Sequence, residues 1–203
     1  MNQPPIHPLS PLSPFKNWGK PVITLLAIAG LLVVGYYFFE GDTDDSQEAI
    51  ALSFKTDATP EDIASIASYQ YTETYTHPTH RFSFKHPAGF TVTPLETESE
   101  EVLLIESPNK KIGIQIMITP YGEDIDLTED IVRASISETK MSDAQPVEIG
   151  KGRRGVAFLS DNPQFGGASR EVWFIYKKNL YQISTYAEFD AFLKGLFGTW
   201  EFY

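Results

Sequence analysis

The sequence of 203 residues contains no cysteine, and its 27 acidic residues far outnumber its 16 basic ones. Without cysteine the chain forms no disulfide, thiolate nucleophile, cysteine-ligated zinc site or cysteine-linked lipid anchor. It also lacks the G-x-S-x-G and H-E-x-x-H motifs, a phosphate-binding glycine loop, and an S-x-x-K motif with its partner motifs. We therefore predict no catalytic residue, no cofactor and no cofactor-binding residue. The net charge of −11 disfavours a nucleic-acid partner.

One long apolar run stands near the N-terminus. Val22 to Phe39 reads VITLLAIAGLLVVGYYFF, 18 residues without a charge. As a helix it would measure roughly 27 Å, close to the thickness of the hydrocarbon core of a bilayer. A buried helix of a small soluble domain usually keeps a polar face, which this run lacks. The sequence therefore predicts one transmembrane helix over residues 21–39, with the lipid bilayer as its partner.

Charges around this run predict the topology. Lys16 and Lys20 are the only charged residues before Glu40, and all 27 acidic residues lie from Glu40 onward. The positive-inside rule then places residues 1–20, a disordered Pro-rich tail, in the cytoplasm. The C-terminal part is expected to be extracytoplasmic, anchored in the cell membrane by a single pass. The apolar run is followed by no small-x-small cleavage site, which disfavours a cleaved signal peptide.

Residues 40–68 are predicted to form an acidic spacer. Eight acids lie between Glu40 and Asp62 against a single base, Lys55. Their mutual repulsion favours an extended segment. The stretch Thr59-Pro60-Glu61-Asp62 is typical of a helix start, with a capping threonine, a proline at the first position and acids in the first turn. One short helix, ending near Ala67, is expected within the spacer.

From residue 69 to residue 203 the pattern changes to closely spaced strands. The clearest signal is an isoleucine at every second position from Ile112 to Ile118. Further strands are expected at Tyr69–Tyr75, Phe82–Phe84, Phe90–Thr93, Val102–Ile105, Pro146–Lys151, Gly155–Leu159, Arg170–Lys177 and Leu180–Thr185. These strands predict an extracytoplasmic α+β domain over residues 69–203.

Two helices are expected within this domain. Asp126 can cap the first one, with Glu129 three residues later. Thr185 and Glu188 have the spacing of a capping box for the second, which Gly198 would end. This last helix carries a continuous apolar stripe: Phe189, Phe192, Leu193, Leu196, Phe197 and Trp200. Such a stripe needs the face of a sheet to cover.

Several segments of the domain resemble the PsbP-like family. They are FSFKHPAGF at 82–90, Leu104-Ile105-Glu106, Ile114–Pro120, Gly166-Gly167 before a long hairpin, and the aromatic terminal helix. The family is named after an extrinsic lumenal protein of photosystem II and includes bacterial envelope proteins. The resemblance covers residues 69–203 and implies an antiparallel sheet with helices on both faces, an α/β/α sandwich. Phe90 stands where the family often has Trp, and Arg81 where it often has Gly. These motifs mark a fold and no site.

Three histidines lie within ten residues: His77, His80 and His86. Histidine pairs can hold zinc or copper, and the photosystem relatives are linked to manganese and calcium retention. His77 and His80 are therefore the candidate residues for a metal site. No acidic residue lies between them, however, and His86 is expected to point away from the face of Phe82 and Phe84. Surface histidines without a metal are the favoured interpretation.

The acidic residues of the domain form two runs. One comprises Glu96, Glu98, Glu100 and Glu101, and the other Glu123, Asp124, Asp126, Glu129 and Asp130. Calcium needs six to eight converging oxygen ligands, and an EF-hand loop has a fixed spacing that neither run shows. We interpret them as a solvated face and a helix N-terminus, without a metal.

Six basic residues are candidates for partner binding. Lys151, Arg153 and Arg154 share one turn, and Arg170, Lys177 and Lys178 belong to the following hairpin. Sequential strands usually pack side by side, which would place all six charges on one side of the domain. The hypothesis is a docking patch for an anionic partner, either an envelope protein or an envelope polymer.

The sequence favours a membrane-tethered extracytoplasmic binding or assembly module without catalytic activity. The alternative is an envelope enzyme whose site assembles from scattered residues. A signalling receptor is disfavoured, because the 20-residue tail carries no effector domain.

Overall fold

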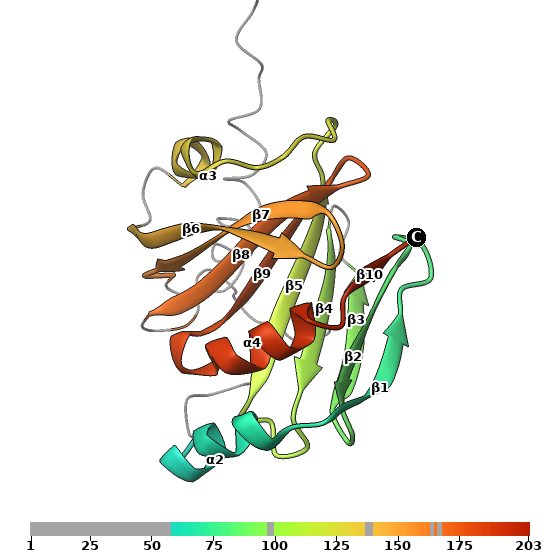
Figure 1. Ribbon diagram of the computed structural model, residues 1–203, viewed down its shortest axis with the longest axis vertical. Helices are drawn as coiled ribbons and strands as arrows, with labels where there is room; N and C mark the ends of the chain where they lie inside the picture. Colours follow the sequence, from blue (N-terminus) through green and yellow to red (C-terminus); the bar gives the residue numbers. More distant parts are fainter. Residues whose placement is uncertain (1–57, 97–99, 137–139, 163–164, 166–167) are drawn as a thin grey trace, which may run out of the picture.

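The computed structural model describes residues 58–96, 100–136, 140–162, 165 and 168–203, which form a mostly antiparallel β domain with a few helices (Figure 1). The predicted tail (1–20), the predicted transmembrane segment (21–39) and the spacer up to residue 57 lie outside these residues. Within the described part of the chain, no helix has both the length and the apolarity needed to cross a bilayer.

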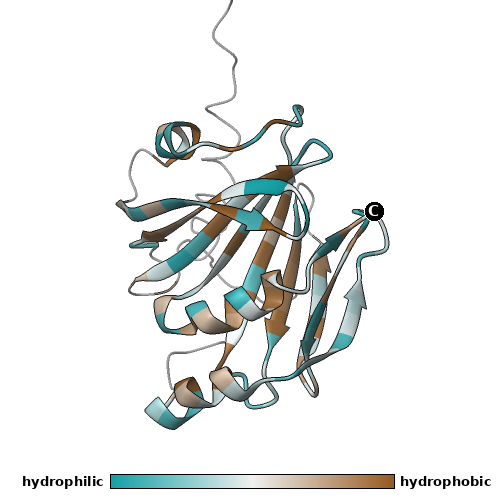
Figure 2. Ribbon diagram, in the orientation of Figure 1, coloured by the Kyte–Doolittle hydropathy of each residue, from teal (hydrophilic) through white to brown (hydrophobic). Residues whose placement is uncertain are grey.

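Seven strands form the larger sheet, in the order β3-β4-β5-β9-β8-β7-β6, and every neighbouring pair is antiparallel. Their bounds are β3 Thr91–Glu96, β4 Glu101–Glu106, β5 Gly113–Pro120, β6 Met141–Ile149, β7 Arg153–Ser160, β8 Ser169–Tyr176 and β9 Asn179–Tyr186. The alternating isoleucines lie in β5, near the middle of the sheet, where Ile114, Ile116 and Ile118 are at most 2% exposed. Hydrophobic residues concentrate in these central strands (Figure 2).

A smaller sheet joins segments from both ends of the described chain. Its strands lie in the order β1 (Tyr71–Thr76), β2 (Phe82–Pro87) and β10 (Glu201–Phe202), and both pairs are antiparallel. The two-residue strand β10 has no signal in the sequence, because two residues are too few to show an alternating pattern.

Helices cover both faces of the larger sheet. On one face lies α4 (Asp190–Phe197), preceded by the 3-10 turn η3 (Ala187–Phe189), with α2 (Pro60–Ser65) and the 3-10 turn η1 (Ile66–Ser68) packed against the same core. On the other face lies α3 (Glu129–Ser135). The predicted apolar stripe is confirmed, since five of its six members are buried: Phe189, Phe192, Leu193, Leu196 and Trp200.

Strand β8 shows how the sheet separates two cores. Val172 and Phe174 belong to the larger core, which also contains α4 and the smaller sheet. Trp173 and Ile175 alternate with them and belong to the smaller core, which contains Val132 of α3. Because neighbouring strand residues point to opposite faces, β8 contributes to both cores at once.

The caps of two helices differ from the prediction. The N-cap of α3 is Thr128, whose hydroxyl accepts a hydrogen bond from the backbone N–H of Ile131 at 3.4 Å, and Asp126 lies outside the helix. The predicted capping box of Thr185 with Glu188 does not form, because Thr185 still belongs to β9. Its hydroxyl donates to the carbonyl oxygen of Gly113 at 2.6 Å instead. A sequence pattern cannot show that a distant carbonyl competes for the capping side chain.

Residues 58–68 pack against the folded domain, although the sequence assigns them to the spacer. Ile66 is 3% exposed within the larger core, and Ile63 packs against that core. Thr59 caps α2 as predicted, in a reciprocal box with Asp62. The Asp62 carboxylate accepts hydrogen bonds from Thr59 and from Lys111, at 3.0 Å, and these lower its pKa to about 2.

Candidate functional site

Two neighbouring hairpin turns bring five of the six predicted basic residues to one end of the larger sheet. We call this set the basic end: Lys151, Arg153, Arg154, Lys177 and Lys178. The turn between β8 and β9 consists of the two lysines alone, and both have positive φ angles, 48° and 64°. The turns lie on the side of the molecule where the C-terminus is marked, away from α2 (Figure 1).

Two residues of the basic end are held by neighbours. The guanidinium of Arg153 and the ammonium of Lys177 each lie 5.3 Å from the ring centre of Tyr176, at cation–π distance. Arg153 also forms an ion pair with Asp124 at 3.1 Å. Lys177 donates a hydrogen bond to the backbone oxygen of Tyr203 at 3.0 Å. These contacts fix the two side chains and reduce their availability for a partner.

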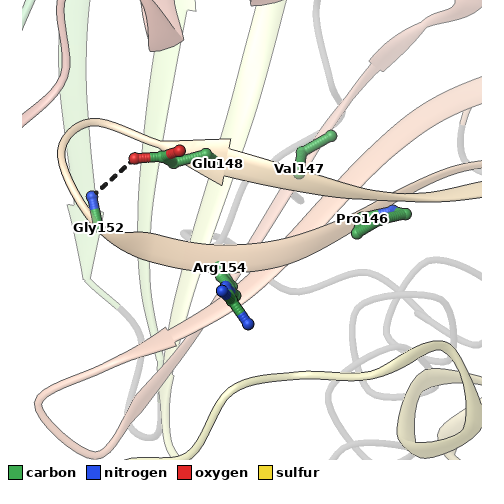
Figure 3. A pocket seen from close by; sticks show the side chains of 5 residues that line it. All are labelled: Pro146, Val147, Glu148, Gly152 and Arg154. Atoms are coloured by element: carbon green, nitrogen blue, oxygen red, sulfur yellow. Dashed lines mark hydrogen bonds between the residues drawn. The ribbon is translucent and has the colours of Figure 1, made fainter.

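Lys151, Arg154 and Lys178 are exposed and form no ion pair within the described residues. An open hollow lies beside Arg154 along the hairpin of β6 and β7, and it is lined by Pro146, Val147, Glu148, Gly152 and Arg154 (Figure 3). The Glu148 carboxylate points to the turn and accepts the Gly152 N–H at 3.0 Å, while Arg154 extends away from it.

Arg170 is not part of the basic end. It is the second residue of β8 and pairs with Leu159 and Thr185, whereas Lys177 follows the end of the same strand. Seven residues at about 3.3 Å per residue put the two about 23 Å apart along the strand. The Arg170 guanidinium lies 3.2 Å from Asp190 and 3.6 Å from Asp143. The prediction that six charges share one side is therefore wrong for Arg170, because Arg170 and Lys177 lie at opposite ends of β8.

An acidic loop borders the basic end. The backbone N–H groups of Tyr121 and Gly122 donate to the carbonyl oxygen of Lys178, at 2.7 and 3.2 Å. Glu123 and Asp124 follow directly and are exposed. The positive field of the basic end is thus limited on one side, and the cations that face solvent most freely are Lys151 and Arg154.

A second cluster joins the two sheets and contains both histidines singled out from the sequence. His77 and His80 lie in the turn between β1 and β2, and Glu101 begins β4. His77 Nε2 lies 2.7 Å from Glu101 Oε1, and His80 Nε2 lies 3.2 Å from Glu101 Oε2. The ligand atoms of all three lie within 4.8 Å of one another, the only such group of three found among the described residues.

This cluster corrects the interpretation of the histidines as surface residues. His77 is 2% exposed, and the acid that joins it, Glu101, is 24 residues away in the sequence. His86 is also buried, and its ring centre lies 6.5 Å from that of Phe84, so it shares the face of Phe82 and Phe84. Positions 82, 84 and 86 have the same parity along a strand, a signal that does predict a common face.

A third polar cluster surrounds Glu171 in β8, on the face of the larger sheet that carries α3. Glu171 is 3% exposed and accepts hydrogen bonds from Ser169 at 2.7 Å, Ser160 at 3.3 Å, Asn162 at 3.4 Å and Ser184. Burial raises the pKa of Glu171, and the hydrogen bonds from Ser184, Ser169 and Asn162 oppose the rise. The cluster can hold a proton inside the sheet. No sequence signal reveals it, since its serines come from three strands.

Comparison with known proteins shows a likeness in fold. No protein-family model and no curated protein matches the chain. The solution structure of cyanobacterial PsbP (CyanoP) from Synechocystis sp. PCC 6803 is similar to it, with a TM-score of 0.47 and 11% identity. The match covers 64% of this chain and 92% of that one. It agrees with the PsbP-like resemblance of the sequence.

Proposed function

We propose that this chain is a single-pass cell-membrane protein whose extracytoplasmic domain is a binding or assembly module for an anionic partner. In this proposal residues 21–39 span the bilayer, and Lys16 and Lys20 keep the N-terminus in the cytoplasm. The partner is an acidic protein face or an anionic polymer of the envelope. No catalytic step is part of the proposal.

The observation that carries the proposal is the set of unpaired cations at the basic end. Lys151, Arg154 and Lys178 stand on two adjacent turns in a chain of net charge −11. Exposed charges that form no ion pair contribute little to stability, so stability does not explain why they are gathered. Opposite charges on a partner would be attracted over about a Debye length, roughly 8 Å at physiological salt.

The position of the basic end also supports a partner away from the membrane. The described chain begins next to α2, and the two turns lie away from α2 in the molecule (Figure 1). A domain held through residues that precede α2 would present the basic end outward from its attachment. This geometry suits a tethered module that reaches another envelope component.

A charge-reversal experiment tests the binding role. The triple variant K151E/R154E/K178E replaces the unpaired cations, and the matched control K85E/K110E/K140E makes the same charge change at three exposed lysines elsewhere. The control includes Lys110, whose φ of 56° resembles that of Lys178. We expect salt-sensitive binding of polyglutamate or polyphosphate by the wild type and the control, and none by the basic-end variant. Equal binding by all three proteins would refute the proposed surface.

A protease experiment tests the topology separately. Protease added to intact spheroplasts should digest the domain from Tyr69 onward and leave the N-terminal tail intact. A domain that is protected until the cells are lysed would place it in the cytoplasm and refute the topology, whatever the binding results.

A further inference from the structure

The hydrogen bonds of His77 fix the position of its proton. Its Nδ1 accepts the backbone N–H groups of Thr79 and His80, each at 3.2 Å. A ring nitrogen that accepts hydrogen bonds carries no proton, so the neutral ring holds its single proton on Nε2. That N–H then donates to Glu101 Oε1 at 2.7 Å. The ring therefore connects its own turn to β4 of the larger sheet in one tautomer only.

The same tautomer argues against a metal at this place. A neutral histidine that binds a metal through Nε2 must carry its proton on Nδ1, where two backbone N–H groups already point. The distance of 2.7 Å between His77 and Glu101 is that of a charge-assisted hydrogen bond. Two ligands of a tetrahedral zinc ion, at bond lengths of about 2.0–2.1 Å, would lie about 3.3 Å apart. The three groups fit a hydrogen-bonded cluster better than a metal site.

A second proton on His77 would destabilise the turn between β1 and β2. It could bind only at Nδ1, where it would face the N–H groups of Thr79 and His80 and remove both hydrogen bonds. It would also place a charge on a side chain that is fully buried. Burial lowers the pKa of His77, although the neighbouring Glu101 carboxylate opposes this shift.

Among the described side chains that contact the His77 ring, Glu101 is the only acidic one. The ring of Tyr75 in β1 lies 6.0 Å away, that of Phe82 in β2 lies 4.9 Å away, and that of His80 lies 4.7 Å away. Tyr181 of β9 faces His80 at 6.2 Å, and burial raises its pKa. No lysine or arginine of the described chain lies within ion-pair distance of Glu101, whose two partners there are the histidines.

We infer that the turn between β1 and β2 is a proton-operated latch that is anchored on the larger sheet through Glu101. The latch is closed when neutral His77 holds Thr79 and His80 with one nitrogen and Glu101 with the other. It opens when His77 binds a second proton at Nδ1, which removes the hydrogen bonds from Thr79 and His80 and releases the turn, while Nε2–H keeps its contact with Glu101. The turn also contains Arg81 at a φ of 56°, a conformation that residues other than glycine rarely adopt, so its shape depends on such contacts.

The direction of the pH effect follows from linkage. The folded pKa of His77 lies below its ordinary value of 6.5, so the unfolded chain binds this proton more readily. The contribution of His77 to stability is therefore complete above about pH 6.5 and is lost as the pH falls. One such proton changes the folding equilibrium constant by up to about tenfold per pH unit.

The tautomer and the opening are measured together by NMR on the full-length protein with ¹⁵N-labelled backbone and histidines. At pH 7.5 we expect His77 to show the tautomer protonated on Nε2. As the pH is lowered from 7, its second protonation should coincide with lower protection factors at the amides of Thr79 and His80, that is, with faster exchange relative to the intrinsic rate at the same pH. A His77 protonated on Nδ1 at pH 7.5, or protonation with unchanged protection factors, would overturn the latch.

Variants separate His77 from the other groups. In H77N the side-chain oxygen can still accept the turn N–H groups, but the residue does not titrate, so its urea midpoint should lose less between pH 7.5 and 5.5 than that of the wild type. The control H86N replaces another buried histidine, and a pH dependence that falls equally in H77N and H86N would refute the assignment to His77. Identical pH dependence of wild type and H77N would refute the proposal. If H77N does not fold, the NMR titration of the wild type still decides.

Zinc chloride is the probe for the competing interpretation. Addition of zinc to the full-length protein at pH 7.5 should leave the His77 ring signals unchanged. Zinc-dependent shifts of these signals that vanish in E101Q would show a metal site and overturn the latch.

Discussion

The ring of Tyr71 in β1 lies against Gly195 in α4, and its hydroxyl donates a hydrogen bond to the carbonyl oxygen of Phe192 at 3.0 Å. A Cβ at position 195 would overlap the outer atoms of this ring. Glycine in the middle of α4 is therefore required by the close approach of the smaller sheet, although it is unfavourable for the helix itself.

This relationship predicts that G195A destabilises the domain. The tyrosine must move and give up its hydrogen bond, which together cost about 2–3 kcal/mol, and the better helix propensity of alanine returns about 1 kcal/mol. We expect a net loss of about 1–2 kcal/mol in urea unfolding. In the Y71A background the same substitution should stabilise instead. G198A is the control, since Gly198 has a helical φ of −61° and no close contact. The same sign in both backgrounds would contradict the prediction.

Replacement of Arg81 by glycine should stabilise the protein. Arg81 has a φ of 56°, which costs an L-residue about 1–2 kcal/mol, while glycine loses more backbone entropy on folding. The expected net gain is about 0.5–1 kcal/mol at pH 8, where the latch is closed. K85G, in the exposed face of β2, should lose a similar amount. A loss of stability in R81G would show that the side chain has a role that the structure does not reveal.

The buried carboxyl of Glu171 should give a pH dependence opposite to that of the latch. Its folded pKa is raised by burial, so the folded state keeps a proton that the unfolded chain releases. Stability from this group is complete below its ordinary value of 4.5 and falls as the pH rises, by up to about 1.4 kcal/mol per pH unit. Urea unfolding in the H77N background removes the contribution of the latch from this measurement. E171Q should remove the decline, whereas E188Q, at an exposed position, should keep it.

Ile66 tests the boundary of the domain. Its side chain is 3% exposed in the larger core, so I66A should reduce the free energy of unfolding by about 2–4 kcal/mol. The exposed neighbour Ala67 provides the control, and A67S should change stability by less than about 0.5 kcal/mol. A comparably small effect of I66A would mean that residues 58–68 do not belong to the cooperative unit.

The sequence predicts well what depends on local periodicity. The isoleucines of β5 and the stripe of α4 each bury one face of one element, and this repeats within a few residues. The strand ends move by only a few residues from the expected positions. The resemblance of the segments around Phe82–Phe90 adds the expectation of an antiparallel sheet with helices on both faces, which the structure has.

What the sequence misses is decided by pairings between distant segments. Glu101 reaches His77 because the smaller sheet packs on the end of β4, and no spacing rule connects positions 24 residues apart in this way. Thr185 has a perfect local pattern for a helix cap, yet Gly113 takes its hydroxyl across the sheet. Arg170 shows the converse error, since it is near Lys177 in sequence but a strand length away in space. The partners of charged side chains and of capping side chains can be predicted only once the order of the strands is known.

The contacts between the two ends of the described chain have a consequence for the folding kinetics. The Tyr71 hydroxyl meets α4 and the Tyr203 hydroxyl meets the Phe82 carbonyl, each across 121 residues of chain. A nascent chain can therefore form much of the seven-stranded sheet while β2 still lacks β10, and the aromatic face of β2 is covered only after β10 has been synthesised. Such a high contact order predicts refolding in the range of milliseconds to seconds, with closure of the smaller sheet as a late event.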